Sequence, residues 1–208
     1  MRRRSPVSAL SAVEYYADFK KELLASNCQK CSLSKHRTNI VVDRGNPEAR
    51  VVFVGEAPGA NEDREGRAFV GRGGKLLDEL MLKEAGFDTN RDGLIINVAK
   101  CRPPANRPPT SEEAASCRPY LEKQLILVRP LILVLLGATA LKHIIPEKKG
   151  SPMNEEVGKF FCHPAYPGMN IIVFFHPAYI LRDPRKKPLM VEHIRRFKTL
   201  WTSLLGAH

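Results

Sequence analysis

Four short apolar runs, separated by helix-like sequence, constrain the fold of this chain more than any other feature. They occupy residues 51–54, 94–98, 131–136 and 171–175. The runs are almost entirely apolar and do not alternate with polar residues, which is typical of strands buried on both faces of a parallel sheet. A length of 208 residues suits one domain. The pattern therefore predicts the α/β class, as a single-domain three-layer α/β/α sandwich with a central, mostly parallel sheet.

Helical periodicity fills the sequence between these strands. Thr110-x-x-Glu113 has the spacing of a capping box at the start of one helix, and Gly86 is suited to cap the end of another. Segments 28–47 and 102–109 lack the periodicity, and the four prolines of the second predict a stiff loop. Helices are expected at residues 12–25, around 76–81, and at 114–128, 137–145 and 190–204.

The first twelve residues lie outside this pattern. Arg2, Arg3 and Arg4 make the segment basic, and no apolar core of a signal peptide follows them, so secretion is not expected. We expect residues 1–12 to form a flexible basic extension and residues 13–208 to form the domain. The longest apolar run has strand length, far below the ~18 residues of a membrane span, so no membrane partner is expected.

The net charge of +11 predicts a polyanionic partner, most simply a nucleic acid. Residues 182–198 alone carry seven Lys or Arg against two acids. For Arg195, Arg196 and Lys198, at the helical end of this stretch, a solvated helix face is the alternative interpretation.

Polar and special residues follow three of the four strands, at the point where each strand ends. Glu56, Ala57 and Pro58 follow the first strand, Asn97 lies near the end of the second, and His176 follows the last. Because ligands bind beyond the carboxyl ends of parallel strands, we expect these residues to converge on one edge of the sheet. Taken singly, a solvated loop carboxylate or a structural histidine is the alternative interpretation.

The tetrapeptide His-Pro-Ala-Tyr occurs twice, at residues 163–166 and 176–179. The second copy follows a clean apolar strand, whereas the first precedes Pro167-Gly168, which is a turn signal. We interpret the first copy as a hairpin connection and the second as the functional one.

Four of the five cysteines have the spacing of two ligand pairs. Cys28-x-x-Cys31 lets two sulfurs face one metal centre, and Cys101 and Cys117 form a wider pair. Four thiolates suit a zinc ion or an iron–sulfur cluster, and the spacing does not separate the two. The alternative is that Cys101 and Cys117 are ordinary buried residues. Cys162 lies in an apolar stretch, which predicts a buried, inert thiol.

Several motifs in order along the chain resemble those of the family 4 uracil-DNA glycosylases, the iron–sulfur type of bacteria and archaea. The resemblance extends from about residue 27 to the C-terminus. It rests on the segments 55–59, 62–63, 66–71, 97–104, 106–107, 176–179 and 181–182 and on the four paired cysteines.

The resemblance implies a reaction and a division of roles. The enzyme would flip deoxyuridine out of DNA and hydrolyse its N-glycosidic bond, as a monofunctional glycosylase that starts base excision repair. Phe69 would stack on the uracil, Asn97 would read its edge and His176 would donate to O2 of the leaving base. The catalytic candidates are Glu56, Asn97 and His176, and the uracil-binding candidates are Glu56, Ala57, Pro58, Phe69, Asn97 and His176.

The same resemblance implies roles at the edge of the site and at the cysteines. Glu62 would be a gate against the thymine methyl group, and Leu181 and Arg182 would contact DNA where the base is flipped out. Cys28, Cys31, Cys101 and Cys117 would hold a [4Fe-4S] cluster. The water-activating group is left open between Glu56, Asn97 and a backbone carbonyl.

The expected partner is uracil-containing DNA, single- or double-stranded, bound by a monomer in the cytoplasm of a bacterium or archaeon. Two alternatives stay open. One is an iron–sulfur nucleic-acid binding protein without activity, and the other is a relative that cross-links to the abasic site, although the basic histidine-containing insertion of that relative is missing here.

Overall fold

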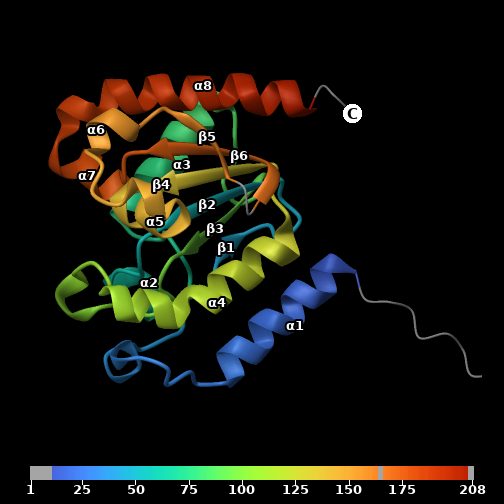
Figure 1. The fold of residues 1–208 in the computed structure, drawn as a ribbon, viewed down its shortest axis with the longest axis vertical. Coiled ribbons are helices and arrows are strands. Elements are labelled where there is room, and N and C mark those ends of the chain that lie inside the picture. Colours follow the sequence, from blue (N-terminus) through green and yellow to red (C-terminus); the bar gives the residue numbers. More distant parts are fainter. Residues whose placement is uncertain (1–10, 164–165, 206–208) are drawn as a thin grey trace, which may run out of the picture.

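The structure is a computed structural model that describes residues 11–163 and 166–205 (Figure 1). The basic extension expected at residues 1–12 falls almost entirely outside this part. A six-stranded sheet runs in the order β1-β3-β2-β4-β6-β5, and its four central strands are parallel. The predicted α/β class and parallel sheet are therefore confirmed. The strands are β1 (Arg44–Gly45), β2 (Val51–Gly55), β3 (Gly93–Asn97), β4 (Ile132–Leu136), β5 (Phe160–His163) and β6 (Tyr166–Phe174).

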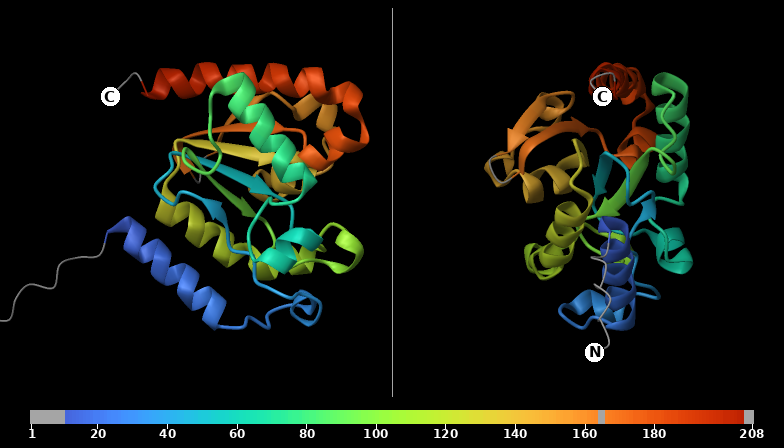
Figure 2. Two further views of the ribbon diagram at one scale, coloured as in Figure 1. Left: turned by 180° about the vertical axis from the view of Figure 1, so that it is seen from behind. Right: turned by 90° about the vertical axis from the view of Figure 1, so that its right-hand side faces the viewer.

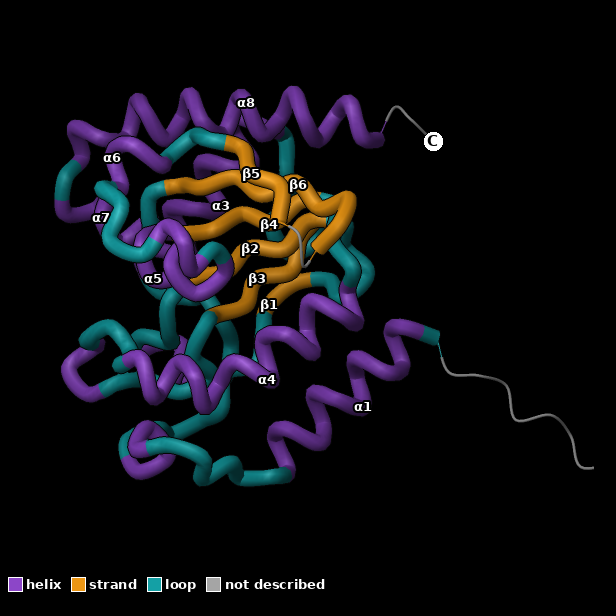
Figure 3. Tube along the Cα trace, in the orientation of Figure 1, coloured by secondary structure: helices purple, strands orange, loops and turns teal. Residues whose placement is uncertain are grey.

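Helices cover both faces of the sheet, as the three-layer prediction requires. Figure 2 shows α3 and α8 on one face and α4 and α5 on the other, and α1 lies outside α4 (Figure 3). The helices are α1 (Ala12–Ala25), α2 (Ala60–Glu65), α3 (Arg72–Ala85), α4 (Ser111–Val128), α5 (Gly137–Ile144), α6 (Met153–Glu156), α7 (Pro177–Arg182) and α8 (Lys187–Leu205).

Local sequence signals begin and end these helices where expected. The Thr110 side chain accepts from the Glu113 amide, and the Glu113 carboxylate accepts from the Thr110 amide, which completes the predicted capping box of α4. Gly86 ends α3 with a left-handed φ of 68°. In none of the helices of the described part is there an apolar stretch long enough to cross a membrane.

The two edge strands, β1 and β5, are antiparallel to their neighbours and were not predicted as strands. β5 and β6 form a hairpin, so the first His-Pro-Ala-Tyr copy does lie at a hairpin connection. The chain reverses between His163 and Tyr166, earlier than the Pro167-Gly168 signal suggested. The prediction that Cys162 is buried is wrong, because it lies on edge strand β5 and is exposed.

Candidate active site

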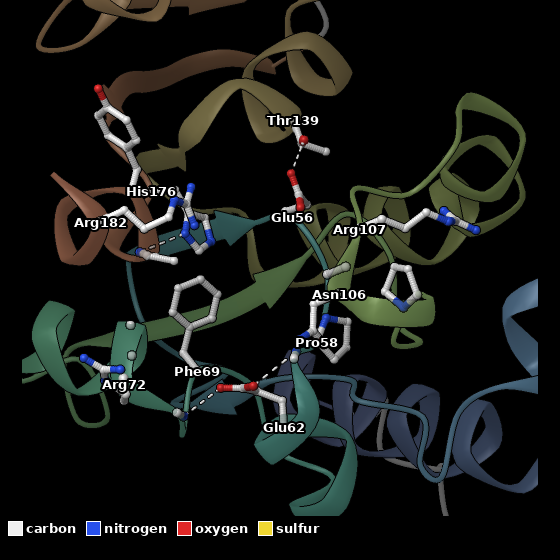
Figure 4. A pocket seen from close by; sticks show the side chains of 18 of the residues that line it. Glu56, Pro58, Glu62, Phe69, Arg72, Asn106, Arg107, Thr139, His176 and Arg182 are labelled. Carbon is white, nitrogen blue, oxygen red and sulfur yellow. Dashed lines mark hydrogen bonds between the residues drawn. The ribbon is translucent and has the colours of Figure 1, made fainter.

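A cavity of about 770 Å³ opens at the carboxyl ends of the parallel strands (Figure 4). Its wall combines the segment after β2, the start of α5 after β4, and the segment after β6. The start of α3 and the proline-rich loop before α4 close the other sides. The sequence-predicted residues that line it are Glu56, Ala57, Pro58, Glu62, Phe69, His176 and Arg182.

Asn97 lies at the end of β3 and is buried just behind this wall. Asn97 is 1% exposed, and within the part of the chain that the structure describes neither Oδ1 nor Nδ2 has a hydrogen-bond partner. A Cβ on Gly55 would lie 2.5 Å from both Asn97 Oδ1 and the Phe69 ring, so the amide and the ring meet over this glycine. Buried amides are normally paired. The unpaired donor and acceptor of Asn97 can therefore bind a ligand.

Phe69 is held by its backbone in an unusual conformation. Its φ of 53° lies in the left-handed region, which costs a non-glycine residue free energy. The N-terminal turn of α3 presses against it, because a Cβ on Gly74 would lie 1.7 Å from the Phe69 carbonyl oxygen. The ring lies 5.6 Å from the His176 imidazole, between centroids. The packing therefore fixes an aromatic face in the cavity wall.

His176 is the N-cap residue of α7, and its Nδ1 accepts a hydrogen bond from the Ala178 amide at 3.2 Å. Burial lowers the pKa of His176 from 6.5 to about 4, and the charge of Arg182 adds to this shift. The imidazole is therefore neutral at physiological pH. Because Nδ1 accepts, the proton resides on Nε2, which makes that atom a hydrogen-bond donor.

Glu56 is bound to a residue that the sequence pattern did not single out. The Thr139 hydroxyl donates to Glu56 Oε2, and both residues line the cavity (Figure 4). Thr139 lies in the first turn of α5, directly after β4. Its position directly after a predicted strand could have identified it, as it did for Glu56 and His176. The segment after each parallel strand reaches the same edge of the sheet.

Glu62 joins two loops of the cavity wall. Its carboxylate accepts hydrogen bonds from the Gly59 amide at 3.1 Å and the Gly71 amide at 2.7 Å. These bonds connect the segment after β2 to the start of α3, on either side of Phe69 (Figure 4). The geometry thus gives Glu62 a clamping role in addition to its place on the wall.

Positive side chains surround the cavity. Arg182 is exposed at the end of α7 next to Leu181, which is 36% exposed. Arg72 and Arg107 line the cavity from α3 and the proline-rich loop, and neither was predicted from the sequence. Several cations around one opening favour binding of a polyanion.

The fold brings the four paired cysteines to one region, although they come from three separate segments. Cys28 and Cys31 pack against a small apolar cluster that contains Cys101. Burial raises the pKa of Cys117, and the neighbouring Cys31 and Cys28 raise it further. Burial also raises the pKa of Cys101 to about 11. Four thiols gathered in one region are a donor set that a zinc ion or an iron–sulfur cluster can use.

Hydrogen-bond donors surround these sulfurs. The Tyr120 hydroxyl lies 3.4 Å from Cys28 Sγ, and Arg37 Nη1 lies 3.5 Å from Cys101 Sγ. Within residues 11–163 and 166–205, no three His, Cys, Asp or Glu side chains converge as ligands of a single ion. In a [4Fe-4S] cluster each thiolate binds a different iron, so its ligands need not converge on one point. The four thiols and their donors therefore fit such a cluster.

Comparison with known proteins agrees with this site. The family model of the uracil DNA glycosylase superfamily matches residues 42–203. A type-4 uracil-DNA glycosylase of Thermotoga maritima is 44% identical over 176 residues, which cover 83% of this chain and 88% of the relative. Those of Sulfurisphaera tokodaii and Saccharolobus solfataricus are each 40% identical, over 87% and 85% of this chain and 82% of each relative. The chain thus belongs to the uracil DNA glycosylase superfamily and, within it, to the type-4 uracil-DNA glycosylases.

Proposed function

We propose that this enzyme releases uracil from DNA by hydrolysing the N-glycosidic bond, and that it leaves an abasic site without cutting the backbone. The observation that supports this most is the unpaired, buried amide of Asn97 beside the Phe69 ring and near the neutral imidazole of His176. A stacking surface and a leaving-group donor then lie in the wall of one cavity, and the base reader lies directly behind that wall.

Uracil recognition would use Phe69 and Asn97. Extruding the nucleotide from the duplex costs a few kcal/mol, which stacking and hydrogen bonds in the cavity offset. The Asn97 amide can donate to uracil O4 and accept from N3–H. Cytosine presents the opposite pattern and would leave buried polar groups unpaired, which discriminates strongly against it.

Leaving-group stabilisation would come from His176. Bond cleavage develops negative charge on the uracil ring, and a donor aimed at O2 stabilises that charge. Nε2 carries the proton, and the Ala178 amide holds the ring in this orientation. No prior protonation is needed, because the neutral tautomer is the donor.

Glu56 would orient the attacking water. Thr139 occupies Oε2, which leaves Oε1 as an acceptor on the cavity wall. Glu62, the other predicted carboxylate of the wall, accepts with both oxygens from the backbone. The other role considered for Glu62 is that of a gate. In that role its side chain would exclude the thymine methyl group from the space beside the C5 edge of the base.

DNA would be held at the opening of the cavity. Leu181 would enter the space that the flipped base vacates, and Arg182 would bind a neighbouring phosphate. Arg72 and Arg107 would extend the phosphate contacts around the opening. The seven Lys and Arg side chains of residues 182–198 would add electrostatic affinity for DNA, which decreases as the salt concentration rises.

Cys28, Cys31, Cys101 and Cys117 would hold the [4Fe-4S] cluster. When bound, the cluster cross-links the N-terminal loop to the segment after β3 and to α4. We also propose that residues 13–208 act as one domain and one monomer, and that residues 1–12 are an extension. We further propose that the protein acts in the cytoplasm of a bacterium or archaeon, and the bacterial and archaeal origin of its relatives supports this.

The test uses an oligonucleotide with a single uracil. Incubation followed by alkali should break the strand at that position, whereas a matched thymine oligonucleotide should stay intact. Normal DNA binding without any break would refute the enzymatic function. The purified protein should absorb near ~400 nm and contain about four irons per chain, as expected of thiolate-ligated iron–sulfur clusters. A colourless zinc protein would refute the cluster assignment.

A further inference from the structure

Lys100 is a buried cation between the cysteines and the base-reading residue. It is 1% exposed and lies three residues after Asn97 and directly before Cys101. Its backbone amide donates to Cys117 Sγ at 3.4 Å. Its ammonium is directed to the other side and donates to the Asn97 carbonyl oxygen at 2.6 Å. One residue therefore contacts both regions.

The bond from Lys100 fixes the end of β3. The next two amides are also bound, because Val98 donates to the Gly55 carbonyl and Ala99 donates to the Glu56 carbonyl, each at 3.0 Å. With these three bonds the peptide groups after Asn97 cannot rotate freely. The orientation of the Asn97 side chain depends on that backbone, and no other hydrogen bond restrains the amide itself.

The charge of Lys100 has no carboxylate partner within salt-bridge distance in the described part of the chain. The Lys100 side-chain amine is instead held by the Asn97 carbonyl oxygen. A buried polar group needs such a partner, so this hydrogen bond fixes both the Lys100 side chain and the Asn97 peptide.

We propose that Lys100 is a positioning residue that couples the cysteine site to uracil recognition. Its backbone amide binds the Cys117 sulfur, and its side-chain amine holds the Asn97 peptide so that the unpaired amide faces the base. The proposal rests on the proposed function and extends it, because it assigns the cysteine site a part in base selectivity. Lys100 touches neither substrate nor reacting atoms, so it is not a catalytic residue.

The test compares Lys100→Met with Arg44→Met. Both changes replace one buried cation by the same unbranched apolar side chain, and Arg44 pairs with Asp78 away from the cavity. The readout is binding to DNA that carries a 2′-fluorinated, cleavage-resistant deoxyuridine, against the same DNA with thymine. Lys100→Met should lower this selectivity at least about tenfold, whereas affinity for the thymine DNA stays within about twofold. Arg44→Met should keep the selectivity.

Two results would overturn the proposal. Lys100→Met could keep wild-type selectivity with full iron content, or Arg44→Met could lose as much selectivity, which would reveal a general effect of instability. Lys100→Gln, which keeps a donor but no charge, serves if Lys100→Met does not fold and should lose part of the selectivity. Uracil release by the wild-type protein reports separately on the proposed function.

A spectroscopic measurement tests the coupling without any substitution. Hydrogen bonds to cluster sulfurs alter the cluster, and Lys100 donates to Cys117 while it holds Asn97. The Fe–S(Cys) stretching bands in the resonance Raman spectrum of the wild-type protein should shift when the fluorinated uracil DNA binds. The thymine DNA should cause no such shift. Identical spectra with both DNAs would overturn the proposal.

Discussion

The unpaired amide of Asn97 predicts a substitution that stabilises the protein and removes its selectivity. Asn97→Leu replaces the amide by an apolar group of similar size at a position that is 1% exposed. Neither amide atom forms a hydrogen bond in the free protein, so the substitution breaks no internal bond. Leucine also suits the surroundings, because the Phe69 ring lies next to the amide over Gly55.

The magnitudes derive from the number of unpaired atoms. Each buried polar group without a partner costs about 1–3 kcal/mol, and part of the gain is lost because leucine is branched differently. We expect a net gain of about 1–2 kcal/mol, or roughly 2–8 °C in Tm for a chain of this size. In the complex the same change removes two hydrogen bonds to uracil, about 2–4 kcal/mol, so kcat/KM should fall roughly 30- to 1,000-fold.

Thermal unfolding and single-turnover uracil release measure the two effects. Gln124→Met is the matched control, since Gln124 is also a buried amide but its Nε2 donates to the Tyr16 hydroxyl at 2.9 Å and the Val42 carbonyl at 3.1 Å. This control should lower Tm. A lower Tm for Asn97→Leu, or an unchanged kcat/KM, would show that the amide is not held open for the base.

Four further predictions concern the other polar residues of the cavity. His176→Asn should lower kcat by about 10²–10³, whereas the same change at His163 should leave it nearly unchanged in the same single-turnover assay. Because burial lowers the pKa of His176 to about 4, the unfolded chain takes up this proton near pH 6.5 and the folded chain only near pH 4. Stability should therefore fall as the pH drops through this interval, and His176→Asn should reduce the fall in Tm. Thr139→Val should lower kcat about tenfold with little change in KM, because Glu56 loses its hydrogen-bond partner. Thr139→Ser should restore kcat, and an unchanged kcat in Thr139→Val would show that Thr139 does not orient Glu56. Glu62→Gln should weaken uracil release by loosening the wall without admitting thymine, whereas release of thymine from a T·G mismatch would support the gate instead.

The central fold could be predicted because buried parallel strands have a simple sequence pattern. The four apolar runs became β2, β3, β4 and β6, within a few residues at their ends. Edge strand β1 was missed because it consists of only Arg44 and Gly45, and β5 was missed because its apolar run is short. The error at Cys162 follows from the missed strand β5, because an apolar stretch on an edge strand can expose one face.

The site was predictable in part, for a related physical reason. Glu56, Asn97 and His176 could be located because they stand at the carboxyl ends of predicted strands, and the topology brings those positions to one edge. Phe69 could be assigned only through the resemblance to the family, because its place depends on a left-handed backbone and on close contact with α3. Thr139 was missed because the segment after β4 was considered only as a helix.

The polar groups of the cavity differ in how they are held, and the difference matches what each must do. The carboxylates of Glu56 and Glu62 and Nδ1 of His176 are all bound to other protein groups, which fixes their orientation before substrate arrives. Among the described residues of the site, the Asn97 amide has no protein partner at either atom, and in the proposed function it is the group that discriminates between bases. A site with every polar atom satisfied internally would bind uracil and cytosine with a smaller difference. In the proposed function, the open amide lowers the stability of the free protein, and the penalty for leaving it unpaired against a mismatched base would be the source of selectivity.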